Sequence, residues 1–118
     1  MNILEMYQKS SAKILNEEEQ LAVVKNDGHT IQYIHNPSEQ VQLAAVKNDG
    51  YAVKNNGHAI KYIHNPSEQV QLVAVKNDGY VIQYIHNPSE VVQIAALEND
   101  PNCIKFFKKA WLPPVRKI

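Results

Sequence analysis

The stretch His35–Gly50 reads HNPSEQVQLAAVKNDG, and copies of it make up most of the 118-residue chain. Residues 20–41 and 71–92 are two copies of 22 residues, and residues 42–70 form a copy of 29 residues between them. A degenerate fourth copy starts at residue 93. Because self-similarity at a fixed period is the signature of repeat architectures, this stretch decides the expected fold.

Each copy carries a signal for the start of a helix. A residue before proline is pushed out of the α region, and proline is accommodated at the first helical position. We therefore predict that Asn36 is the N-cap, Pro37 the first helical residue and Glu39 the acid of a capping box. The same arrangement is predicted at residues 65–68 and 87–90.

Each copy also carries a signal for the end of that helix. Gly28, Gly50 and Gly79 follow Asn-Asp, which predicts a left-handed residue after the helix C-terminus. Beyond the glycine, Ile31 and Ile34 are three residues apart, as on one face of a short helix or 3₁₀ segment. No unit can bury its apolar stripe alone, so neighbouring units are expected to stack.

The predicted fold is all-α: a short α-solenoid of stacked helix-turn-helix repeats, with one irregular 29-residue copy and with terminal caps. Residues 1–118 are expected to form a single repeat domain. Within it, the predicted parts are an N-terminal cap at 1–19, repeats at 20–97, a C-terminal cap at 98–112 and a tail at 113–118.

The predicted caps differ from the repeats in sequence. The first long helix is expected to start at Asn16, with Ser11 as the alternative start. At the other end, Ile104, Phe107 and Trp111 are expected to pack back onto the last repeat.

Composition excludes several classes of protein. The chain has 12 basic and 12 acidic residues, so no net field attracts it to nucleic acid or to a membrane. One cysteine, Cys103, allows no internal disulfide and fits a reducing compartment. No apolar run approaches 18 residues and no secretory signal is visible, so a cytoplasmic location is expected.

The segments Ala45–Val53, AVKNDGYAV, and Ala74–Ile82, AVKNDGYVI, each precede a Lys- or Gln-Tyr-Ile triplet, which comes seven residues later at 61–63 and directly at 83–85. This pattern resembles a tandem-repeat domain of unknown function from bacterial, phage and large-virus proteins, over roughly residues 20–107. It is also distantly similar to variant leucine-rich repeats, which alternate α and 3₁₀ helices in a superhelix. The resemblance implies a bacterial or phage setting and brings no catalytic or ligand residues with it.

Chemically active residue types have structural explanations. His35, His64 and His86 recur once per copy, but stacked helices lie about 8–10 Å apart, too far for histidines that share one zinc ion. Cys103 has no base or orienting group in its local sequence and is interpreted as a packed apolar residue. We therefore expect no catalytic residues, no metal and no cofactor, and the chain is not predicted to be an enzyme.

Two rows of side chains recur with the copies. The glutamines flank the predicted long helices and are interpreted as a polar face: Gln42, Gln71 and Gln93. The tyrosines belong to the predicted short helices: Tyr33, Tyr62 and Tyr84.

The leading functional hypothesis is a non-catalytic protein-interaction module, such as a small phage- or bacterium-encoded protein that binds and occludes a host protein. The irregular residues 51–57 are a candidate protruding loop, since loops on rigid scaffolds often carry function, although a neutral scar of deletion is an equal reading. The candidate binding residues are Tyr33, Tyr51, Lys54, Asn55, His58, Tyr62, Tyr80 and Tyr84.

Two alternatives use the ends of the chain. Nucleic acid, a less favoured partner, would bind basic residues near the C-terminus: Lys105, Lys108, Lys109, Arg116 and Lys117. End-to-end self-assembly would pair this basic end with the acidic N-terminal end. The expected partner is a protein, with a homo-oligomer as the alternative and no membrane.

Overall fold

The computed structural model describes residues 15–47 and 56–111, and every regular element within these ranges is helical. The α-helices are α2 (Glu17–Asn26), α3 (Glu39–Val46), α4 (Glu68–Asn77) and α5 (Glu90–Asn99). They alternate with the 3₁₀-helices η1 (Gly28–Tyr33), η2 (Asn56–Tyr62), η3 (Gly79–Tyr84) and η4 (Pro101–Phe106). The expectation of an all-helical chain is confirmed for these residues.

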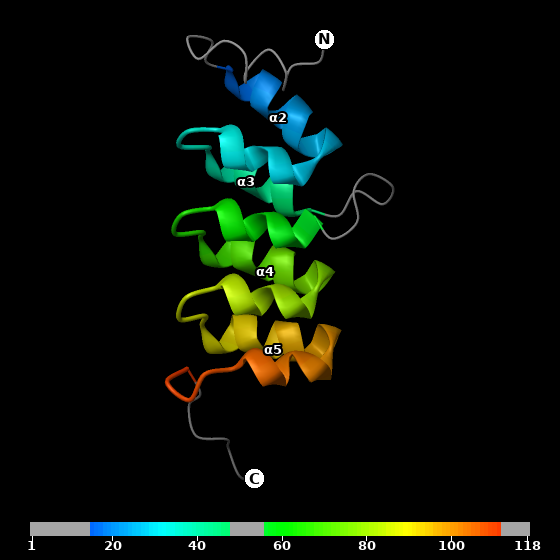
Figure 1. Cartoon of the computed structure of the whole chain (residues 1–118), viewed down its shortest axis with the longest axis vertical. Helices are drawn as coiled ribbons and strands as arrows, with labels where there is room; N and C mark the ends of the chain where they lie inside the picture. Colours follow the sequence, from blue (N-terminus) through cyan, green and yellow to red (C-terminus); the bar gives the residue numbers. More distant parts are fainter. Residues whose placement is uncertain (1–14, 48–55, 112–118) are drawn as a thin grey trace.

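The helices follow one another along the long axis of the molecule (Figure 1). Each α-helix packs on the α-helix before it, each 3₁₀-helix packs on the 3₁₀-helix before it, and α–η contacts join the two rows. The connections 34–38, 63–67 and 85–89 lie on one side of the molecule, at the left in Figure 1. The centre of the core, at 2% exposure or less, includes Ile31, Ile60 and Ile82 from the 3₁₀-helices and Val24, Val46 and Val75 from the α-helices.

The helix starts are not where the sequence predicted them. The N-caps are Ser38, Ser67 and Ser89, whose hydroxyls accept the N–H groups of Val41, Val70 and Val92. Each helix begins one residue later, at a glutamate. The predicted caps Asn36, Asn65 and Asn87 instead have φ of 52–54°, in the left-handed region that asparagine tolerates. The proline therefore precedes the cap rather than occupying the first helical position.

The predicted start of the first long helix at Asn16 is confirmed. Its side chain accepts from the N–H of Glu19, and the Glu19 carboxylate accepts from the N–H of Asn16. These two bonds form a complete capping box. The alternative start, Ser11, lies outside the described residues.

The capping serines also connect successive helices. Ser38 donates to the Glu17 carboxylate at 2.5 Å, Ser67 to Glu39 at 2.7 Å, and Ser89 to Glu68 at 2.5 Å. Each glutamate is the first residue of the preceding helix. Ser67 and Glu39 are 28 residues apart in the sequence, whereas the partners of the other two bonds are 21 residues apart. All three are hydrogen bonds from a serine hydroxyl to a glutamate carboxylate. The serine–glutamate bond between α4 and α3 is therefore kept despite the seven additional residues of the long copy.

The glycines do not have the predicted role. Gly28 and Gly79 are the first residues of η1 and η3, and Gly79 is not in the left-handed region. A Cβ at Gly79 would lie 2.5 Å from the carbonyl oxygen of Ala96, so glycine is required by the close approach of α5. Gly50 lies outside the described residues.

The glutamine row is structural rather than an exposed polar face. The side-chain amide nitrogens of Gln42, Gln71 and Gln93 donate to the carbonyls five residues earlier, those of Pro37, Pro66 and Pro88, at 2.9–3.0 Å. Gln20 makes the same bond to Leu15 at 2.8 Å. These bonds hold each connection against the first turn of its own helix.

The degenerate fourth copy that the sequence predicts from residue 93 has the same pair of helices as the other copies. Residues 98–106 complete α5 and form η4, in which Pro101 takes the place of the glycine. Phe107 and Trp111 pack onto the core as expected, and their ring centroids lie 5.7 Å apart. Ile104 does not pack back: it is 50% exposed, whereas its equivalents Ile31, Ile60 and Ile82 are each covered by the next unit.

Candidate interaction surface

The 3₁₀-helices form a row whose aromatic side chains pair across successive helices. His29 of η1 meets Tyr62 of η2 edge to face, with ring centroids 5.9 Å apart. His58 meets Tyr84 at 5.5 Å, and Tyr80 meets Phe106 at 5.4 Å. Because each pair joins the second or third residue of one helix to the last residue of the next, aromatic contacts continue along the whole row.

The tyrosines that end the 3₁₀-helices combine anchoring with exposure. Tyr33, Tyr62 and Tyr84 are 39%, 38% and 38% exposed. For Tyr62 and Tyr84, the edge contacts with histidine hold the ring, so part of each ring faces solvent in a constrained orientation. An aromatic group that is already ordered loses little side-chain entropy when a ligand covers it.

Two lysines place their ammonium groups over aromatic rings of the 3₁₀-helices. The Lys61 ammonium lies 5.2 Å from the Tyr62 ring centroid and 5.8 Å from that of Tyr84. The Lys105 ammonium lies 4.9 Å from the Tyr80 centroid and 5.4 Å from that of Phe106. These distances fit cation–π contacts, which favour a lysine that lies over the surface rather than extending away from it.

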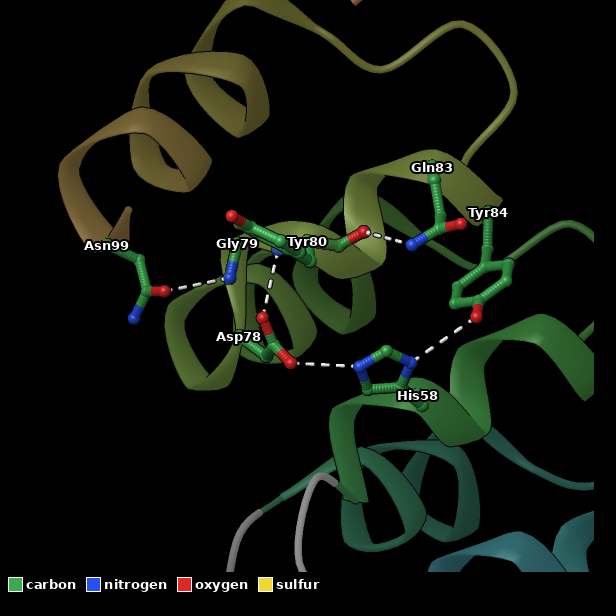
Figure 2. Close-up of polar contacts among 7 residues, drawn as sticks. All are labelled: His58, Asp78, Gly79, Tyr80, Gln83, Tyr84 and Asn99. Carbon is green, nitrogen blue, oxygen red and sulfur yellow. Dashed lines mark hydrogen bonds and ion pairs between the residues drawn. The ribbon is translucent and has the colours of Figure 1, made fainter. Parts of the chain in front are cut away.

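His58 is the centre of a polar cluster between η2 and η3 (Figure 2). Its Nε2 lies 2.8 Å from an Asp78 carboxylate oxygen, and its Nδ1 lies 3.4 Å from the Tyr84 hydroxyl. The other Asp78 oxygen accepts the backbone N–H of Tyr80, and the nearby Gly79 N–H donates to the side-chain oxygen of Asn99.

This cluster has the elements of an acid–base pair but serves as a structural link. Asp78 is the N-cap of η3, so its carboxylate is committed to the helix start while it orients His58. In the first copy, His29 has no aspartate at the equivalent position of the next unit, since that residue is Asn56. Within the described ranges, no three metal-binding side chains gather into a group.

The predicted binding residues are only partly brought together. Tyr33, Tyr62, Tyr84 and His58 belong to the 3₁₀ row. Tyr80 is partly buried between Phe106 and the Lys105 ammonium, so it is a packing residue more than a contact residue. Tyr51, Lys54 and Asn55 lie outside the described residues.

Among the residues that the structure describes, the predicted basic set comprises Lys105, Lys108 and Lys109, and two of these lysines lie over aromatic rings. Lys105 lies over Tyr80 and Phe106, and the Lys108 ammonium lies 5.6 Å from the Trp111 ring centroid. Lys109 is exposed in the turn before Trp111. Arg116 and Lys117 lie outside the described residues.

Two equivalent hollows are lined by residues of the connections 34–38, 63–67 and 85–89 and by their neighbours. The first has a volume of about 440 Å³ and is lined by Ile34, His35, Asn36, Pro37, Gln42, Tyr62, Ile63 and His64. The second has about 400 Å³ and is lined by Ile63, His64, Asn65, Pro66, Gln71, Tyr84, Ile85 and His86. The two lists match position by position, and His64 belongs to both.

Sequence reasoning placed no site at these hollows. The recurrent His-Asn-Pro triplet was the available signal, but it indicated only a helix start. The hollow needs the left-handed Asn36 to turn the connection and the next unit to supply Tyr62, and neither is visible in one copy.

Cys103 is fully buried, as expected for a packed apolar residue. Burial, with the nearby Asp100 carboxylate, raises the pKa of its thiol. Both effects disfavour the thiolate that a nucleophile needs.

Comparison with protein-family models, with curated proteins and with solved structures finds no match to this chain. In the part of the chain that the structure describes, no helix is both long enough and apolar enough to cross a membrane.

Proposed function

We propose that the chain is a short α-solenoid that acts as a non-catalytic protein-interaction module. The observation that carries this proposal is the row of exposed tyrosines Tyr33, Tyr62 and Tyr84 on successive 3₁₀-helices, of which Tyr62 and Tyr84 are held by edge contacts with histidine. Tyrosine is enriched in protein interfaces because its ring buries a large area at low entropic cost and its hydroxyl still forms hydrogen bonds. A small phage- or bacterium-encoded protein that covers a host protein would be one such module.

A protein partner fits this surface better than nucleic acid does. The chain has no net charge, whereas binding to the phosphate backbone depends on clustered cations. Lys105 and Lys108, from the predicted nucleic-acid site, lie over aromatic rings. Lys61 contributes a single positive group to the tyrosine row, which suits an acidic or polar rim on a protein partner.

The experiment is affinity capture from bacterial lysate with and without nuclease, with the bound proteins identified by mass spectrometry. The full chain is compared with the double variant Tyr33→Ala/Tyr62→Ala and with the control Gln40→Ala/Gln69→Ala, two exposed positions on α3 and at α4. We expect one nuclease-resistant protein in stoichiometric amount, about tenfold weaker binding for the tyrosine variant and unchanged binding for the control. Circular dichroism checks that all three chains remain equally helical.

Other outcomes would overturn this proposal. Retention of the same protein by the tyrosine variant would remove the tyrosine row from the interface. Loss of all binding after nuclease would favour nucleic acid. Recovery of the bait alone, with sedimentation showing growth of the species with concentration, would favour self-assembly through the exposed Ile94 and Ile104 of the last unit.

A further inference from the structure

The position of a third hollow is filled by the chain itself. Gln93 is the equivalent of Gln42 and Gln71, and its side-chain nitrogen donates to the Pro88 carbonyl at 2.9 Å. The same nitrogen lies 3.4 Å from the carbonyl oxygen of Trp111. A turn closed by the Trp111 N–H and the Lys108 carbonyl brings that oxygen there.

Burial shows that this turn covers the third position. Gln93 is 4% exposed and Pro88 is buried, whereas their equivalents at the two open hollows are only partly buried. Trp111 is 9% exposed and lies against Phe107. In the open hollows, the residues equivalent to Phe107 are Ile63 and Ile85, which form part of the walls.

The open hollows retain an unused hydrogen-bond donor. A glutamine amide nitrogen carries two N–H groups. In Gln42 and Gln71 one of them donates to the Pro37 or Pro66 carbonyl, at 3.0 Å in both cases. Within residues 15–47 and 56–111, neither nitrogen has a second acceptor, whereas Gln93 has the Trp111 carbonyl.

We infer that the two open hollows bind a peptide segment of a partner protein that carries a bulky aromatic side chain. The aromatic group packs against the isoleucine, proline and tyrosine walls, and a main-chain carbonyl accepts the second N–H of Gln42 or Gln71. Trp111 makes this carbonyl contact within the chain. The inference rests on the proposed function, because Tyr62 and Tyr84 of the tyrosine row each line one hollow. It specifies the kind of peptide that the interaction module would bind.

The shared wall predicts two aromatic groups in the partner segment. His64 borders both hollows, so a single extended segment that crosses it can occupy both. Once one aromatic residue of the segment is bound, the second is held near the other hollow at a high effective concentration. A segment with two aromatic residues is therefore expected to bind more tightly than a segment with one.

The test follows the glutamine side-chain amide signals of the full ¹⁵N-labelled chain by NMR. The probe is N-acetyl-tryptophanamide, and N-acetyl-alaninamide is the matched control without an aromatic ring. We expect saturable shifts of the Gln42 and Gln71 signals with the tryptophan probe alone. The Gln93 signal is expected to stay unchanged, because the Trp111 segment covers it.

The variant Trp111→Ala provides the second arm. Removing the indole ring should open the third position, so that Gln93 also responds to the probe. If this variant loses helical signal, the unmodified chain still decides the question. Absence of shifts at Gln42 and Gln71, equal shifts with the alanine control, or an equal response of Gln93 in the unmodified chain would overturn the inference.

Failure of this inference is distinguishable from failure of the proposed function. The probe experiment needs no partner. If a partner is captured but the probe does not bind, the interaction-module proposal stands and the hollows are rejected as the peptide-binding site. Shifts of Gln42 and Gln71 that grow with protein concentration in the absence of probe would assign the hollows to the C-terminal segment of a second copy. That result would overturn binding of a partner peptide.

Discussion

Gly79 and Pro101 occupy the same place in successive units, and the difference between them shows what the position requires. At Gly79, α5 passes so closely that a Cβ would meet the Ala96 carbonyl oxygen, and the Gly79 N–H donates to Asn99 at 2.8 Å. At Pro101 no further α-helix packs over η4 in the described chain. The position therefore needs neither the room that glycine leaves for a neighbouring carbonyl nor a backbone N–H donor. Proline suits this first helical position.

The substitution Gly79→Ala is expected to destabilise the fold by about 1–3 kcal/mol, because the backbone of α5 must shift to admit the methyl group. Urea denaturation followed by circular dichroism measures the free energy of unfolding. The matched control is Pro101→Ala at the equivalent position, which should cost at most about 1 kcal/mol. Equal effects of the two substitutions would contradict the close-approach explanation.

The elements are joined by bonds that serve two helices at once. Ser67 caps α4 by accepting the Val70 N–H and donates to Glu39, the first residue of α3. Its equivalents Ser38 and Ser89 do the same for their own neighbours. Each cap therefore stabilises a helix and sets its position on the preceding one.

The substitution Ser67→Ala removes both bonds and is expected to cost about 1 kcal/mol of stability. The control Glu39→Gln keeps an acceptor oxygen for Ser67 and should cost about 0.3–1 kcal/mol, from the lost charge at the start of α3. Thermal and urea unfolding of both variants give the comparison. A smaller effect for Ser67→Ala than for Glu39→Gln would mean that the serine is not the effective cap.

The whole molecule tolerates a difference of seven residues between its units. α4 stacks on α3 through the same serine–glutamate bond as α3 on α2, although 28 rather than 21 residues separate the partners. The core valines at the end of α3 and α4, Val46 and Val75, are both fully buried. The serine–glutamate bond and the burial of these two valines are therefore kept despite the extra length of the copy.

Deletion of residues 48–54 would join Lys47 to Asn55 and restore a 22-residue copy. We expect helicity to be retained and stability to change by less than about 1 kcal/mol, because a shorter connection alters loop entropy only slightly. Circular dichroism with urea unfolding measures both. The control, deletion of seven residues within α4, should abolish cooperative unfolding.

The same deletion tests part of the predicted binding set. It removes Tyr51 and Lys54, so a partner retained by the shortened chain would exclude these two residues from the interface. Loss of the helical signal would instead show that the deleted residues contribute to the folding of the chain.

Much of the secondary structure is predictable because its signals are local. The 3₁₀ segments after each long helix follow from the spacing of Ile31 and Ile34, and Asn16 follows from its acidic successors. The N-caps Ser38, Ser67 and Ser89 are not predicted because Asn-Pro and Ser-Glu offer competing caps only two residues apart. The choice depends on the glutamate of the preceding helix, which lies 21 or 28 residues away.

The candidate site divides in the same way. The tyrosine row is predictable as a periodic residue type, and Tyr33, Tyr62 and Tyr84 are 39%, 38% and 38% exposed. The hollows were not visible, because each combines a connection from one unit with a tyrosine from the next. Likewise, the link between His58 and Asp78 joins residues 20 apart that carry no common motif.

The period, the alternation of longer and shorter helices and the burial of Ile31 and Ile34 follow from the sequence alone. These properties depend on apolar spacing and turn chemistry within a few residues of chain. Tertiary structure decided which residue caps each helix, why Gly79 must be glycine, and that Ile104 remains exposed while Trp111 is buried. Those outcomes depend on atoms supplied by the neighbouring unit, which brings together residues that no local pattern connects.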